Sequence, residues 1–161
     1  MSKLRPLQQW ICDKCGDIID APEAGYLEWL DDENHKSHSF KIIHGPTHSP
    51  RQSGNCYHYT NALKHNFSSA ALEDFVGKDG LANTIALLDP GTAIQPDFDE
   101  PDVRDVREWV ELFRRLHLRN YEEARLKWSL ARAEGYFADA NQVSAYTQEA
   151  LQEIIELEDE S

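Results

Sequence analysis

The feature that most constrains this chain is a pair of cysteines two residues apart, Cys12 and Cys15, followed directly by Gly16. Two thiolates at this spacing can point at one metal ion from a tight turn. The glycine permits a positive φ after the second cysteine and lets backbone amides approach the sulfur atoms. The sequence therefore predicts that this turn supplies half of a tetrahedral metal site.

The other half of the site must come from residues further along the chain. Cys56 is the remaining cysteine, so four sulfur ligands are excluded within one chain. The fourth ligand is then a histidine, and His44 is preferred because residues 40–44 form a predicted strand that would hold the ring rigidly. His58 is the alternative to His44. The prediction is one structural Zn²⁺ held by Cys12, Cys15, His44 and Cys56.

Two other interpretations of the cysteine pair are weaker. A redox pair is expected within a βαβ pattern, with a helix starting at the first cysteine, and the sequence around Cys12 has neither. Unrelated buried thiols are common in protein cores, but Gly16 favours a metal knuckle. Three cysteines suit a reducing compartment, and the N-terminus has no apolar leader, so a cytoplasmic protein is expected.

Residues 10–58 resemble a zinc-ribbon or treble-clef module, with a Cys-x-x-Cys-Gly knuckle, a hairpin and a second ligand pair. The second pair departs from the usual ribbon, because His44 and Cys56 are not a tight Cys-x-x-Cys. The resemblance implies a small zinc-centred sheet in which the metal supplies part of the folding free energy. Strand patterns are found at 7–11, 17–20, 26–30 and 39–44.

The second half of the chain has helical patterns. Short helices are predicted at 69–76 and 81–88, followed by an acidic linker at 92–101. Further helices are predicted at 102–118, capped by Asp102, at 121–137, and from a cap at Asn141. The predicted class is α+β, with a zinc-binding β module at 1–66, short helices and linker at 67–100, and three helices at 101–161.

The net charge of −13 disfavours nucleic-acid binding, but the charge is unevenly distributed. Residues 34–72 contain four Lys or Arg and no acidic residue. A second basic group lies in the predicted helices, and consists of Arg114, Arg115, Arg119, Arg125, Lys127 and Arg132. Nucleic-acid binding through these two groups is one alternative, and pairing with the neighbouring acidic segments is the simpler interpretation.

A metal-dependent nuclease is the second alternative, built from His58, Asn61 and His65. Such an enzyme needs a base, a group that orients it and a hard metal ligand close together. The spacing here is helical, and residues 34–72 contain no acidic ligand. The sequence therefore favours a non-enzymatic binding module whose partner is another protein. No apolar run is long enough to span a membrane.

Overall fold

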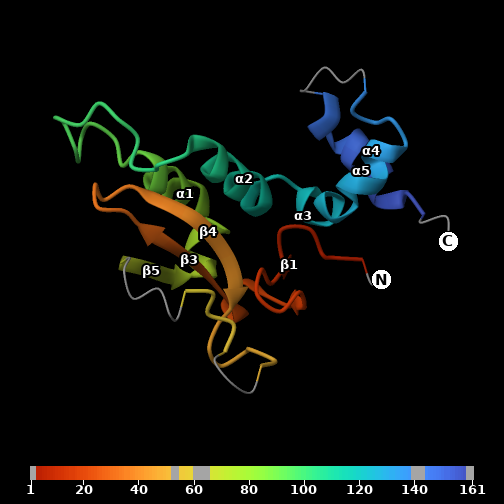
Figure 1. Ribbon diagram of the computed structural model, residues 1–161, viewed down its shortest axis with the longest axis horizontal. Helices are drawn as coiled ribbons and strands as arrows, with labels where there is room; N and C mark the ends of the chain where they lie inside the picture. Colours follow the sequence, from red (N-terminus) through yellow and green to blue (C-terminus); the bar gives the residue numbers. More distant parts are fainter. Residues whose placement is uncertain (1–2, 52–54, 60–65, 139–143, 159–161) are drawn as a thin grey trace.

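The computed structural model describes residues 3–51, 55–59, 66–138 and 144–158. Antiparallel strands lie in the N-terminal half and helices dominate the C-terminal half (Figure 1). This arrangement confirms the predicted α+β class. Among the described residues, no helix has both the length and the apolar character needed to cross a bilayer.

The first strands form a small hairpin. β1 (Trp10–Ile11) pairs antiparallel with β2 (Ile18–Ile19), and the cysteine turn lies between them. Both strands are apolar, and Trp10 and Ile19 are fully buried. The hairpin is too short to be stable alone, so its position depends on what it packs against.

A three-stranded antiparallel sheet follows, with the order β4-β3-β5. Its strands are β3 (Gly25–Asp31), β4 (Ser37–His44) and β5 (Asn66–Ala71). The pairing of β3 with β4 is interrupted by an irregularity between Glu28 and Leu30. A short 3₁₀ turn, η1 (Pro22–Ala24), leads from the small hairpin into β3. The strands predicted at 26–30 and 39–44 are confirmed.

The helix predicted at 69–76 is wrong. Residues 66–71 form β5, and only η2 (Leu72–Phe75) is helical, as a 3₁₀ turn. β5 satisfies the backbone groups on the free side of β3, from Tyr26 to Asp31. Leu72 and Phe75 are buried against the core, so the apolar spacing that suggested a helix belongs to a strand followed by a turn.

Two helices lie next to the sheet. α1 (Gly80–Leu88) confirms the predicted second helix, and α2 (Val106–His117) packs on β4. The expected cap at Asp102 is wrong, because Asp105 caps α2 by accepting from the backbone of Arg107. Asp102 instead lies in a bend before the helix, where its carbonyl accepts from the backbone N–H of Ser37 at 2.8 Å.

The last helices are shorter than the sequence predicts. The expected helix at 121–137 is divided into α3 (Tyr121–Ala124), η3 (Arg125–Lys127) and α4 (Trp128–Ala133). The chain continues through η4 (Ser144–Tyr146) to α5 (Gln148–Glu156), which is capped by Thr147. The cap predicted at Asn141 lies outside the described residues.

Buried apolar side chains form two separate cores. The N-terminal core joins the small hairpin, the sheet and α2, and includes Trp10, Leu27, Ile42, Leu72 and Leu116. The C-terminal core joins α3, α4 and α5, and includes Tyr121, Ala131, Leu151 and Ile154. Figure 1 shows the helices of the C-terminal core at the opposite end of the molecule from the turn between β3 and β4.

Candidate metal centre

The two cysteines of the first turn are held by backbone hydrogen bonds. The N–H of Cys12 donates to the carbonyl of Asp17 at 2.9 Å, and the N–H of Gly16 donates to the carbonyl of Cys12 at 3.0 Å. Gly16 has a φ of 80°, in the left-handed region that glycine adopts without a steric cost. The local sequence thus closes the turn that places the two thiols on the same side.

His44 completes β4 and points its ring at the thiols. Its Nδ1 lies 3.4 Å from Sγ of Cys15 and 3.8 Å from Sγ of Cys56. Its Nε2 lies 3.1 Å from the carbonyl oxygen of Ile18, which can only accept a hydrogen bond. The proton therefore resides on Nε2, and the lone pair of Nδ1 faces the sulfur atoms.

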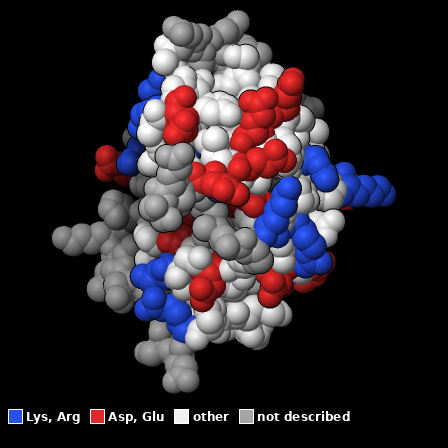
Figure 2. Space-filling view, turned by 90° about the vertical axis from the view of Figure 1, so that its right-hand side faces the viewer, with Lys and Arg blue, Asp and Glu red and all other residues white. Residues whose placement is uncertain are grey.

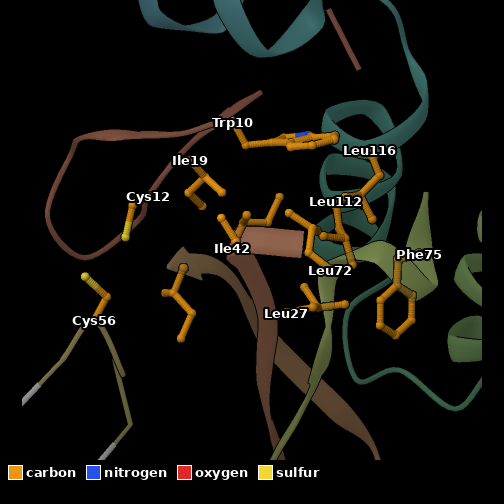
Figure 3. Close-up of a cluster of buried hydrophobic side chains, with 12 residues drawn as sticks. Trp10, Cys12, Ile19, Leu27, Ile42, Cys56, Leu72, Phe75, Leu112 and Leu116 are labelled. Atoms are coloured by element: carbon orange, nitrogen blue, oxygen red, sulfur yellow. The ribbon is translucent and has the colours of Figure 1, made fainter. Parts of the chain in front are cut away.

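The four predicted side chains converge on one point. One ligand atom from each of Cys12, Cys15, His44 and Cys56 lies within 4.8 Å of every other. A tetrahedral zinc with typical bond lengths would set sulfur atoms about 3.8 Å apart and sulfur and nitrogen about 3.6 Å apart. Figure 3 shows Cys12 and Cys56 facing each other beside the N-terminal core. The group could hold a metal ion.

Burial makes the charged thiolate form of this cluster unfavourable without a cation. Cys12 and Cys56 are buried, and all three cysteines are free thiols. Burial, together with the neighbouring Cys12 and Cys56 thiols, raises the pKa of Cys15 to about 12. Thiolates in one pocket repel each other, and a divalent cation removes that repulsion. Ser49 adds a further polar contact, with its Oγ 3.0 Å from Sγ of Cys56.

The hairpin that carries the cysteine turn is tied to β4 through Asp13. The N–H of Asp13 donates to the carbonyl of Ile42 at 2.8 Å, and its carboxylate accepts from the N–H of Ile42 at 2.7 Å. Asp13 lies between the two cysteines in sequence, while Ile42 is two residues before His44. These two bonds therefore fix the cysteine turn relative to the histidine.

A buried ion-pair network links the same turn to α2 and α3. Arg115 donates to both carboxylate oxygens of Asp13, at 3.0 and 2.8 Å, and to both oxygens of Glu122, each at 2.8 Å. Glu122 also accepts from the N–H of Ile11, and the carbonyl of Arg115 accepts from the indole N–H of Trp10.

The network keeps its charges despite burial. Burial alone would lower the pKa of Arg115, but its hydrogen bonds and charge interactions with Glu122 and Asp13 raise it. Burial would raise the pKa of Glu122, but Arg115 and Arg125 together lower it. Since each buried charge here has an opposite partner, the network is stable only while it is complete.

Glu28 supports the segment that carries Cys56. This carboxylate is 0 % exposed and accepts from the N–H of His58 at 2.9 Å. Burial raises the pKa of Glu28, against the effect of its hydrogen bonds to the backbone of His58 and Tyr59. Among the described residues, its Oε1 has no hydrogen-bond partner. Glu28 therefore contributes to the placement of the last ligand, and nothing in its strand pattern indicated this.

The structure separates the two candidate histidines. His44 lies in the group of converging ligand atoms, whereas His58 lies outside it, is exposed, and uses its backbone to contact Glu28. Of the remaining residues of the nuclease hypothesis, Asn61 and His65 lie outside the described residues. Within the part of the chain that the structure describes, this is the one group of three or more ligating side chains whose donor atoms converge.

Several of the basic side chains considered for nucleic-acid binding are engaged within the molecule. Arg115 and Arg125 contact Glu122, and the guanidinium of Arg114 lies 4.3 Å from the ring centroid of Tyr146. On the face shown in Figure 2, Lys and Arg side chains lie in separate groups with Asp and Glu between them. This face presents mixed charge, as the pairing of neighbouring segments implies.

Comparison with known proteins found no matching family model, no matching curated protein and no matching solved structure. The convergence of the four side chains is compatible with the zinc module that residues 10–58 resemble, and no ribbon or treble-clef family is established. Function must therefore be argued from the site itself.

Proposed function

We propose that this chain is a structural zinc protein whose folded module binds another protein and catalyses no reaction at the metal. The observation that carries the proposal is the convergence of three thiols and one correctly oriented imidazole nitrogen within 4.8 Å. Soft sulfur ligands with one imidazole favour zinc over magnesium or calcium, which prefer oxygen.

The composition of the ligand set favours a structural role. Four protein side chains would fill a tetrahedral zinc, whereas catalytic zinc keeps one position for water or substrate. The ligands come from the first hairpin, the end of β4 and the loop after it, so one ion would join three separate segments. In small zinc modules such binding contributes about 10–16 kcal/mol, which is folding free energy.

A protein partner is supported by the exposed apolar side chains. Ile94 is 72 % exposed and Phe98 is 63 % exposed, and both lie in the chain between α1 and α2. Large apolar side chains left exposed in one connecting segment are one mark of an interaction surface.

The test is metal content by elemental analysis on the untagged protein and on single variants. One zinc per chain is expected for the natural sequence, with loss of zinc in Cys12→Ser, Cys15→Ser, His44→Ala and Cys56→Ser. His58→Ala is the matched control, because this histidine lies outside the ligand group, and it should retain zinc. Absence of zinc, or retention of zinc after loss of Cys56, would contradict the proposal.

A further inference from the structure

A groove lies at the end of the molecule away from the C-terminal helices. It has a volume of about 550 Å³ and is bounded by the turn between β3 and β4, by α1, and by the chain that leads to α2. Phe98, Ala86 and Leu87 form its apolar part. Figure 1 shows the turn and the α1–α2 connection side by side at this end.

The groove is held open by backbone hydrogen bonds. The N–H of Asp102 donates to the carbonyl of Leu88 at 2.7 Å, and the backbone of Ser37 bonds to both Asp102 and Arg104. The N–H of Ile94 donates to the carbonyl of Gly91 at 3.0 Å. Phe98 is thus presented outward by an ordered segment, and a partner would not have to order it on binding.

Acidic side chains predominate in the lining of the groove. Residues 89–103 contain five acidic residues and no Lys or Arg. Four of the acidic residues line the groove, namely Asp97, Asp99, Glu100 and Asp102. The lysine that lines it, Lys36, is already engaged with Glu100 at 3.8 Å and with the carbonyl of Pro101 at 2.6 Å. The groove therefore combines an exposed aromatic ring with four carboxylates and one lysine, an excess of negative charge.

The contacts of Lys36 give one example of a cation held at the edge of this groove. An ammonium group is bound there by a carboxylate and a backbone carbonyl together. The four carboxylates do not form a metal site, because the converging ligand group of the described residues is the cysteine–histidine cluster alone. Dispersed carboxylates beside an aromatic ring match several cationic side chains, with arginine able to stack on the ring.

We infer that this groove docks a segment of another protein that carries an apolar side chain flanked by arginine or lysine residues. The inference rests on the protein-binding role proposed above and names the surface and the partner chemistry for it. Phe98 and the apolar wall supply the anchor, and Asp97 and Asp99 select the basic flanks.

The experiment uses the full-length, zinc-loaded chain and a short synthetic peptide of alternating arginine and leucine residues. Amide chemical shifts are followed by NMR, and the dissociation constant is measured by calorimetry at near-physiological salt. Shift changes are expected at 34–37, 86–87 and the non-proline residues of 95–102. Phe98→Ala should weaken binding about tenfold, as loss of an anchor residue does. Asp97→Asn with Asp99→Asn should weaken it by a similar factor.

The matched control removes the same charge elsewhere. Glu149→Gln with Glu158→Gln neutralises two exposed carboxylates outside the groove and should change the dissociation constant less than about twofold. An equal loss in this control would show that the peptide responds to net charge alone, and the inference would be wrong. Shift changes outside the groove, or a dimer formed through it, would also overturn the inference.

Zinc content is measured on the same samples. A groove variant that keeps its zinc but no longer binds the peptide supports the groove as the binding site. If the zinc-loaded natural protein fails to bind the peptide, the docking inference is wrong and the proposed metal centre is unaffected. Loss of zinc from the natural protein would instead overturn the proposed function.

Discussion

The two cores of this protein are held together by different means. In the N-terminal core, aliphatic side chains and the rings of Trp10 and Phe75 pack beside a cluster of three thiols and a histidine. In the C-terminal core, aromatic rings pack on one another: Trp128 lies 5.6 Å from Tyr121, 5.6 Å from Phe137 and 6.3 Å from Tyr146, between ring centroids. Burial of large rings stabilises a small helical unit without a ligand, whereas short strands need one.

This difference suggests that the two cores depend on the metal to different extents. The N-terminal core should lose stability when the metal is removed, while the C-terminal core should keep its packing. The connection between the cores is polar, because Arg115 of α2 joins Asp13 in the cysteine turn to Glu122 in α3. Variants that break this connection, then either core, and finally a single support of the ligand segment would test the difference.

The largest effect is expected from Arg115→Met. Removing the guanidinium leaves the carboxylates of Asp13 and Glu122 with less compensation in a buried site, which typically costs about 3–5 kcal/mol. Urea unfolding followed by circular dichroism measures the loss. Arg125→Met is the control, because this side chain is more exposed and contacts the same two carboxylates less closely than Arg115 does. A smaller loss of stability is therefore expected. Equal losses would show that the contacts of Arg115 contribute no more to stability than those of Arg125.

Two equally buried leucines, one in each core, allow the two cores to be compared. Leu27 and Leu151 are both 0 % exposed, the first in the N-terminal core and the second in the C-terminal core. Each change to Ala should cost about 2–5 kcal/mol through the cavity it leaves. Leu27→Ala should also increase the rate at which a chelator removes zinc, and Leu151→Ala should not. The comparison between the cores fails if both variants lose zinc at the same rate.

The smallest effect concerns Glu28 and pH. Burial raises the pKa of Glu28 above its ordinary value of 4.5, so the folded protein holds this proton more tightly than the unfolded chain does. Stability from this group is complete below the unfolded pKa and is lost as pH rises through the folded pKa. Glu28→Gln removes the titration, so its stability relative to the natural protein should increase as the pH rises above the ordinary pKa of a glutamate. Parallel curves for the two zinc-loaded proteins would disprove the assignment.

The metal ligands could be predicted because the signal is local. A Cys-x-x-Cys-Gly turn fixes two thiols within a few residues, and a strand that ends in His44 leaves that ring at a defined place. The α+β order followed from the change in apolar period along the chain. Both are properties of short segments, and short segments are what a single sequence shows directly.

The supports of the site could not be predicted because they join distant segments. Asp13 and Arg115 are 102 residues apart, and neither has a pattern that indicates its partner. Glu28 lies in a strand where alternation assigns a face but not the loop that covers it. Residues 66–71 show the same problem, since only β3 decides that they form a strand.

The most direct test of the central claim is X-ray absorption at the zinc edge of the protein as purified. The account predicts a four-coordinate ion with three sulfur neighbours at about 2.3 Å and one nitrogen neighbour at about 2.0 Å. His44→Ala should remove the nitrogen neighbour and leave the sulfur neighbours in any zinc that remains bound. A first shell dominated by oxygen or by several nitrogen atoms would contradict the account, since the metal would then be bound elsewhere.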